Sequence, residues 1–156
     1  MAQSAKLFSV MLTKETEKIA EAIEKGEIDN AQQMSDVLSR EHPQHPEALH
    51  MQAILLQMKG DLGRALELMY AAVQLAPEFE SGCFNLAVLL EQAERYDDAE
   101  KIYRHLLNIC PEHMSGQFNL ACLLQNFGRF GEAEEYYRKF IEKTPYHSRA
   151  NGNLGA

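Results

Sequence analysis

Three asparagines recur at a fixed spacing in this chain, and amide groups are well suited to binding a peptide. Asn85 and Asn119 occupy the same place in two copies of the phrase Phe-Asn-Leu-Ala, at 84–87 and 118–121. Asn153 follows Asn119 at the same interval, in the looser phrase Gly-Asn-Leu-Gly. An amide carries both a hydrogen-bond donor and an acceptor. Amides spaced along a surface can therefore bind the main chain of an extended peptide while making few demands on its side chains.

Other reactive side chains form no comparable pattern. His42, His45 and His50 lie close together in the sequence, but no recognised zinc spacing includes them, so we interpret them as solvated loop histidines. The sequence has no GxSxG phrase, no phosphate-binding glycine loop and no Cys–His nucleophile setting, and nothing beside Cys122 would activate its thiol. We therefore predict no enzymatic activity, no metal site and no cofactor.

The composition predicts a folded protein with protein partners. Of the 156 residues, 46% are hydrophobic and 24% are charged, and the formal net charge is −8. Such a charge argues against nucleic-acid or anionic membrane surfaces and favours neutral, apolar or basic partners. No stretch approaches the roughly 18 apolar residues of a membrane span, and the first residues do not resemble a signal peptide. Three cysteines without metal or disulfide spacing indicate reduced thiols. We therefore predict a cytoplasmic location.

Helical periodicity and regular breaks predict a series of paired helices. The first helix covers about 4–25 and ends at Gly26, and the second runs to about Arg40 with Asp29 or Asn30 as its cap. The helices that follow are too short to be stable in isolation, so packing against neighbouring helices must stabilise them. From Pro46 onward the expected helices cover 46–59, 62–75, 80–93, 96–109, 114–127 and 130–143, with 147–155 as the start of another.

Several residue types recur at the interval that separates the asparagines. These columns of recurring residues align the helices as copies of one repeat. Small residues in such columns let two helices approach closely, and larger apolar columns fill the space between them. Glu94 interrupts the glycine column. The columns are Pro43, Pro77, Pro111 and Pro145; Ala31, Ala65, Ala99 and Ala133; Gly26, Gly60 and Gly128; Leu56, Leu90 and Leu124; and Met69, Tyr103 and Tyr137.

These columns resemble the tetratricopeptide repeat, a helix–turn–helix unit of about 34 residues. The resemblance implies an all-α fold, a right-handed solenoid of stacked antiparallel helix pairs forming one domain over residues 1–156. The family's tryptophan position is occupied by Leu49, Cys83 and Gln117, and the Asn-Leu-Ala phrase is similar to the repeats of O-linked N-acetylglucosamine transferase. The implied repeats are a degenerate unit at 4–43, full units at 46–79, 80–113 and 114–147, and a partial helix at 148–156.

The resemblance also implies that the first helix of each repeat lines a concave groove. An exposed apolar patch rimmed by polar groups is typical of a binding surface. Two alternatives remain open: the apolar side chains pack on one another or on the second helices, and each asparagine bridges locally to a neighbouring repeat. The predicted peptide-binding residues are Asn85, Asn119, Asn153, Met51, Ile54, Phe84, Val88, Phe118, His50 and Gln125.

These features predict a non-catalytic interaction module that binds an extended peptide or a partner helix. One alternative is the substrate-recruiting N-terminal region of a larger transferase, such as a glycosyltransferase, and another is a self-assembling scaffold. The short last helix covers only part of the final repeat. We therefore expect either that more chain follows it or that a second copy covers this end, which makes a homo-oligomer.

Overall fold

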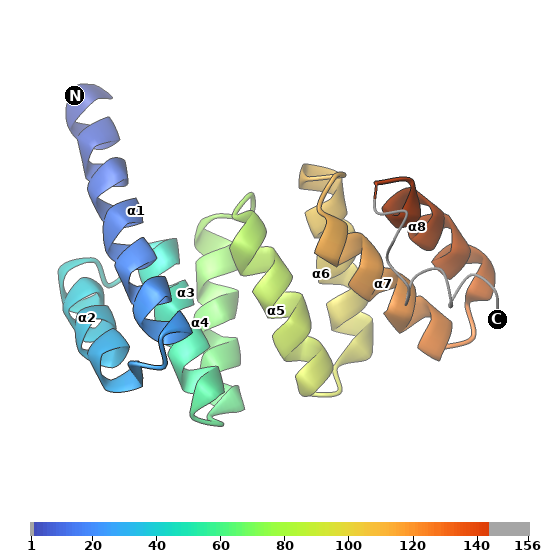
Figure 1. Cartoon of the computed structure of the whole chain (residues 1–156), viewed down its shortest axis with the longest axis horizontal. Coiled ribbons are helices and arrows are strands. Elements are labelled where there is room, and N and C mark those ends of the chain that lie inside the picture. The colour runs from blue at the N-terminus through green and yellow to red at the C-terminus, as the bar shows by residue number, and fades with distance from the viewer. Residues whose placement is uncertain (1, 144–156) are drawn as a thin grey trace. The chain divides into compact units, whose positions relative to one another are not determined.

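The computed structural model describes residues 2–143, and side chains over 12–142, as a series of helices (Figure 1). Within this range no strand occurs, and the helix boundaries agree closely with those predicted from the sequence. No described helix is both long enough and apolar enough to cross a bilayer. The helices are α1 (Ala2–Glu24), α2 (Ile28–Glu41), α3 (Pro46–Met58), α4 (Leu62–Leu75), α5 (Glu80–Gln92), α6 (Tyr96–Ile109), α7 (Met114–Asn126) and α8 (Phe130–Lys143).

The chain forms two compact units, Met1–Gly82 and Cys83–Ala156, whose boundary falls inside α5. The first unit contains α1 to α4 and the second contains most of α5 with α6 to α8. The organisation of residues 1–156 as a single domain of repeats stays a prediction.

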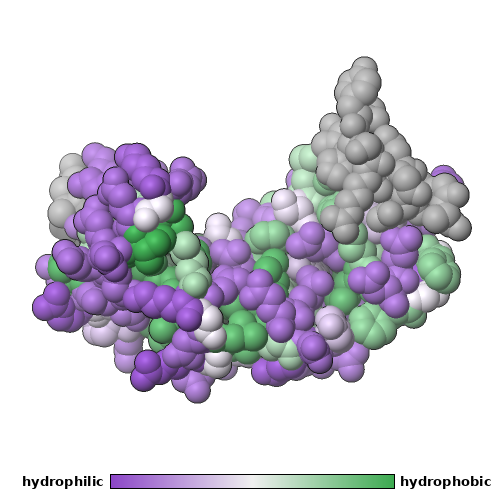
Figure 2. All heavy atoms as spheres, turned by 60° about the horizontal axis from the view of Figure 1, so that its bottom comes forward, coloured by the Kyte–Doolittle hydropathy of each residue, from purple (hydrophilic) through white to green (hydrophobic). Residues whose placement is uncertain are grey.

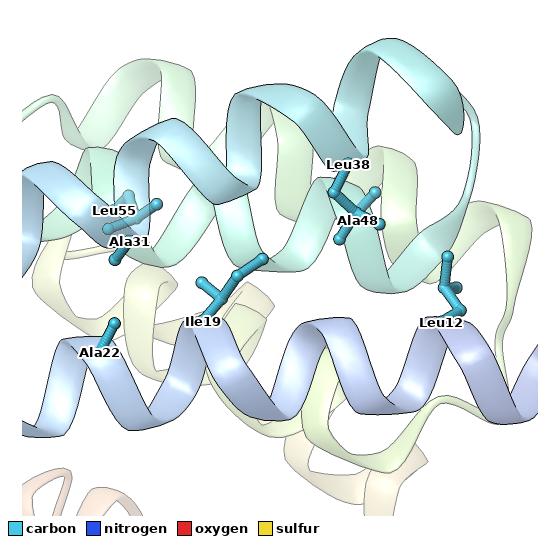
Figure 3. Packing of buried hydrophobic residues seen from close by; sticks show 7 residues of the cluster. All are labelled: Leu12, Ile19, Ala22, Ala31, Leu38, Ala48 and Leu55. Carbon is cyan, nitrogen blue, oxygen red and sulfur yellow. The ribbon is translucent and has the colours of Figure 1, made fainter.

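The first unit is held together by a small apolar core between α1, α2 and α3. Figure 3 shows side chains of α1 facing those of α2 and α3 across this core. Burying one leucine or isoleucine side chain stabilises the folded state by about 1.5–3 kcal/mol. This core therefore holds α1 against α2 and α3, even though the sequence of α1 contains few of the residues that recur in the other repeats. The core residues are Leu12, Ile19, Ala22, Ala31, Leu38, Ala48 and Leu55.

The turns that end α1, α3, α5 and α7 share one left-handed conformation. Gly26, Gly60 and Gly128 have φ angles of 76°, 82° and 72°, and Glu94 has a φ of 58°. In each turn the next N–H returns to the helix, as in the bond from Arg95 N to Leu90 O at 2.8 Å. This is the Schellman type of helix end, for which glycine is the usual residue. The glutamate therefore keeps the turn in spite of its Cβ atom.

The start of α2 corrects one prediction. The residue before this helix is Glu27, whose side chain makes no capping hydrogen bond, so neither Asp29 nor Asn30 is the cap. The helix begins at Ile28, which places both residues inside its first turn. Asn30 instead donates a hydrogen bond from Nδ2 to the Glu27 carboxylate at 3.1 Å.

The second unit is stabilised by buried columns and by a ring of ion pairs. Arg104 contacts Glu100 and Glu132, each at 2.8 Å, while Arg129 contacts Glu100 at 2.6 Å and Glu132 at 2.7 Å. Partial burial of Glu100 acts to raise the pKa of its carboxyl group, but hydrogen bonds from Arg104 and Arg129 hold that pKa below its usual value. Hydrogen bonds from Arg129 and then Arg104 do the same for the pKa of Glu132. The ring therefore ties α6 to the start of α8.

Candidate peptide-binding surface

Phe84 and Phe118 occupy the same repeat position, and each packs on the second helix of its own repeat, while Phe84 also contacts the residue that opens the next repeat. The Phe84 ring lies 6.3 Å from that of Tyr103 and 5.1 Å from that of His113, measured between centroids. The Phe118 ring lies 5.9 Å from Tyr137 and 5.2 Å from Phe140. Both phenylalanines are half-buried. These contacts agree with the alternative in which the apolar residues of the first helices pack against the second helices.

His50 occupies the position of Phe84 in the preceding repeat and is likewise packed against an aromatic ring. Its imidazole meets the ring of Phe79 edge-on, with centroids 5.1 Å apart, and only 4% of the residue is exposed. Burial lowers the pKa of His50 to about 4, so the ring is neutral at pH 7. The interpretation of His50 as a solvated histidine is therefore wrong, because α3 carries this side chain inward.

The amide of Asn119 is held by a buried tyrosine. Its Nδ2 atom donates to the hydroxyl oxygen of Tyr103 at 3.1 Å, and that hydroxyl donates to Oε1 of Glu91 at 2.5 Å. Burial raises the pKa of Tyr103, and the Glu91 carboxylate raises it further, so the phenol stays protonated. A chain of hydrogen bonds therefore links α5, α6 and α7 and positions the Asn119 side chain.

An equivalent tyrosine one repeat later engages another predicted site residue. The hydroxyl of Tyr137 donates to Oε1 of Gln125 at 2.8 Å and lies 3.3 Å from Sγ of Cys122. Gln125 is the counterpart of Glu91 in the preceding repeat. The carbonyl group of Gln125 is thus used within its own repeat, which leaves its amide nitrogen for other contacts.

The remaining predicted site residues lie in both units. Met51 packs against the apolar core of the first unit, and Ile54 is half-buried on the same helix. Asn85 and Val88 are half-buried on α5. Asn153 lies outside the described residues. Figure 2 shows that apolar side chains reach the surface in patches among hydrophilic ones on the face it presents.

Two stretches of the chain match sequence models of the tetratricopeptide repeat, at residues 56–113 and 115–146, and together they cover more than half of the sequence. The chain belongs to the tetratricopeptide repeat family. The predicted fold class, an all-α solenoid of stacked antiparallel helix pairs, is thereby confirmed.

Solved structures similar to this tetratricopeptide repeat chain are distant in sequence. A tetratricopeptide repeat protein from Parabacteroides merdae ATCC 43184 has a TM-score of 0.77 at 21% identity, over 91% of this chain and 57% of its own. PilF of Pseudomonas aeruginosa has a TM-score of 0.82 at 15% identity, over 92% and 65%. A structure of Naa15/Naa10 bound to HypK-THB has a TM-score of 0.79 at 17% identity, over 92% and 22%.

This tetratricopeptide repeat chain spans less than two thirds of each of those three proteins. At such identities the likeness shows the fold alone. Comparison with curated protein sequences gives no match.

Sequence reasoning missed a group of carboxylates and an imidazole in the first unit of the tetratricopeptide repeat chain. Among the described residues, Glu15, Glu41 and His42 have ligand atoms within 4.8 Å of one another, close enough to share a metal ion. All three are exposed or half-buried, and such groups are common without an ion. Glu15 lies on α1, far in sequence from the other two, so no spacing rule could have found the group.

Sequence reasoning also missed three exposed aromatic side chains in the second unit. Tyr96, Phe127 and Phe130 are 38%, 57% and 66% exposed, although large aromatic side chains are usually buried. Tyr96 and Phe130 occupy the same position in successive repeats, so the repeat register contained a signal for exposed aromatic residues there.

Proposed function

We propose that this chain is a non-catalytic interaction module that binds an extended peptide along its first helices, with Asn119 and Asn85 bonded to the peptide main chain. Proteins of the tetratricopeptide repeat family serve as protein interaction modules, which supports the general part of the proposal. One of the similar structures is itself a complex, Naa15/Naa10 bound to HypK-THB. The roles proposed for individual residues are argued from side-chain contacts within the second unit.

The observation that carries the proposal is the way Tyr103 holds Asn119. The hydrogen bond at 3.1 Å uses one N–H of the amide, and the side chain is half-buried. Among the described residues, Asn119 makes no other side-chain hydrogen bond. Its second N–H and its Oδ1 atom therefore remain available for the amide and carbonyl groups of a peptide backbone.

A held amide binds a peptide at a lower entropic cost than a free one. Immobilising a rotamer-rich side chain costs about 0.5–1.5 kcal/mol when it occurs on binding. The Glu91–Tyr103–Asn119 chain of hydrogen bonds fixes the amide before any peptide arrives. Phe84 packs on Tyr103, and Phe118 packs on Tyr137, on the same helices. These contacts support main-chain recognition by preorganised groups.

A peptide-library screen followed by affinity measurement tests this function. Peptides that bind the wild-type chain are titrated against the double variant Asn85→Ala/Asn119→Ala and against Asn126→Ala. Asn126 is exposed near the end of α7 and serves as the matched control. We expect the double variant to bind about fivefold to thirtyfold more weakly, because one or two hydrogen bonds of about 1 kcal/mol each are lost, and the control to bind normally.

Methylation of the peptide nitrogens separates main-chain from side-chain recognition. Replacing single backbone N–H groups of a bound peptide by N–CH₃ removes a donor without changing any side chain. We expect methylation at one or two positions to weaken binding to the wild type by about fivefold or more, because each removes a donor to an asparagine amide oxygen. If the asparagine double variant binds every peptide as the wild type does, the proposed function is wrong.

A further inference from the structure

The exposed ring pair of Tyr96 and Phe127 forms one wall of a pocket at the helix turns of the second unit. The two ring centroids lie 5.3 Å apart, with the planes inclined by 59°. The pocket has a volume of about 320 Å³, and its other lining residues are Glu94, Arg95, Asp97 and Asp98. An exposed apolar cluster on a folded chain is typical of an interaction site.

The charges of this pocket are unbalanced. Arg95 bonds to the Asp98 carboxylate at 2.7 Å, and Lys101 bonds to the same carboxylate at 3.0 Å. Hydrogen bonds from Arg95 and then Lys101 lower the pKa of Asp98, which therefore stays ionised at neutral pH. Within the described part of the chain, Glu94 and Asp97 have no ion-pair partner. Two carboxylates therefore remain uncompensated beside two aromatic rings.

We infer that this pocket binds an arginine side chain of a partner protein. A guanidinium group is planar, stacks on aromatic faces and pairs with carboxylates through its fork of N–H donors. The aromatic pair of Tyr96 and Phe127 offers the stacking surface, and Glu94 and Asp97 offer the acceptors. A lysine ammonium group satisfies the carboxylates but gains less from the rings, because it is compact and strongly hydrated. The net charge of −8 on the chain further attracts a basic partner.

This site is separate from the residues of the proposed function. Its aromatic and acidic groups lie at the α5–α6 and α7–α8 turns, whereas Asn119 lies in the middle of α7. Arginine binding at the turns therefore does not depend on main-chain binding at Asn119, and the two can be tested independently.

Titration with short blocked peptides, followed by nuclear magnetic resonance, tests the inference. The probes are acetyl-Leu-Arg-Leu-amide and two matched peptides in which citrulline or lysine replaces arginine. Citrulline keeps the planar shape but has no charge. We expect the arginine peptide to shift the resonances of residues 94–98 and 127 and to bind at least about fivefold more tightly than the other two. Equal binding of the citrulline peptide overturns the charge argument, and equal binding of the lysine peptide overturns the stacking argument.

Three variants locate the binding. Phe127→Ala and Asp97→Asn are expected to weaken binding of the arginine peptide by about threefold to tenfold. Glu135→Gln, which removes an exposed charge elsewhere in the unit, is expected to leave it unchanged. If Phe127→Ala binds the arginine peptide normally, or if Glu135→Gln weakens it as much as Phe127→Ala does, this pocket is not the arginine site. Circular dichroism of each variant confirms that it is folded.

Discussion

The imidazole of His50 lies 5.1 Å from the ring of Phe79, and one repeat later Phe84 lies 5.1 Å from His113 with the two residue types exchanged. Each pair joins the first helix of a repeat to the residues that open the next repeat. The exchange changes which ring is carried on the helix but keeps one imidazole and one phenyl ring in contact. Ring-to-ring packing is therefore a repeated feature of the first helices of this chain.

Replacing His50 by phenylalanine should remove a pH dependence of stability. The folded pKa of about 4 lies below the ordinary value of 6.5, so the unfolded chain binds more protons between these two pH values. The wild type should lose stability as the pH falls from about 6.5 to 4, by an amount on the order of 3 kcal/mol. Phenylalanine matches the residue found at this position in the next two repeats and has no proton to bind.

Urea unfolding of the wild type and of His50→Phe across this pH range measures the effect. Other groups titrate in both proteins, so the difference between the two curves isolates His50. Parallel curves would mean that the imidazole is protonated equally easily in the folded and unfolded states, contrary to its burial.

Replacing Glu94 by glycine should stabilise the chain. Glu94 adopts a φ of 58°, and a side chain in this conformation costs about 1 kcal/mol relative to glycine. The reciprocal change, Gly128→Ala, places a Cβ atom in an equivalent turn with a φ of 72° and should destabilise by a similar amount. Thermal unfolding measures both. A stabilisation in each case, or in neither, would show that turn geometry does not control these substitutions.

Glu94→Gly should also weaken binding of the arginine peptide, because it removes one of the two uncompensated carboxylates. The same variant is therefore expected to be more stable and to bind less well. Measurement of melting temperature and peptide affinity on one preparation separates these two effects from general damage to the fold.

Replacing Tyr103 by phenylalanine should release Asn119. The variant loses the hydroxyl that bonds to both Glu91 and Asn119, which should cost about 0.5–1.5 kcal/mol of stability. Binding of a library-selected peptide should weaken as well, because the amide is no longer held. Tyr136→Phe is the matched control, since its hydroxyl accepts a hydrogen bond from Arg104 instead. Equal peptide affinity of the two variants would argue against a role for Tyr103 in positioning Asn119.

Replacing Ile19 by alanine should test whether α1 belongs to the cooperative core of the first unit. The side chain is 1% exposed between α1, α2 and α3, so its truncation should cost about 2–5 kcal/mol. Val37→Ala, at a side chain that is 45% exposed, should change stability by less than about 0.5 kcal/mol. Chemical unfolding measures both, and similar losses would contradict the core described for this unit.

The helices could be predicted from the sequence because local signals mark their ends. Prolines follow the second helices, and glycines follow most of the first ones. Both residue types end a helix through the backbone conformation at their own position. The cap of α2 could not be predicted in the same way. Glu27, Asp29 and Asn30 are all polar, and which of them is the cap depends on the residue at which the helix begins.

The surface of the first helices was harder to predict, since burial there depends on what the neighbouring helix offers. The sequence predicts Phe84 as a groove residue but carries no local signal for its contacts with Tyr103 and His113. The Tyr96–Phe127 pair joins residues from two different turns, and only the fold brings them together.

The central claim is that the Asn119 amide binds peptide main chain, and the resonance of its side-chain NH₂ group tests this most directly. The measurement is a titration of isotope-labelled chain with a library-selected peptide, with Asn126 as an internal reference. We expect the Asn119 signal to shift in step with peptide binding while the Asn126 signal stays in place. If the peptide saturates the chain and the Asn119 signal does not move, the claim is contradicted.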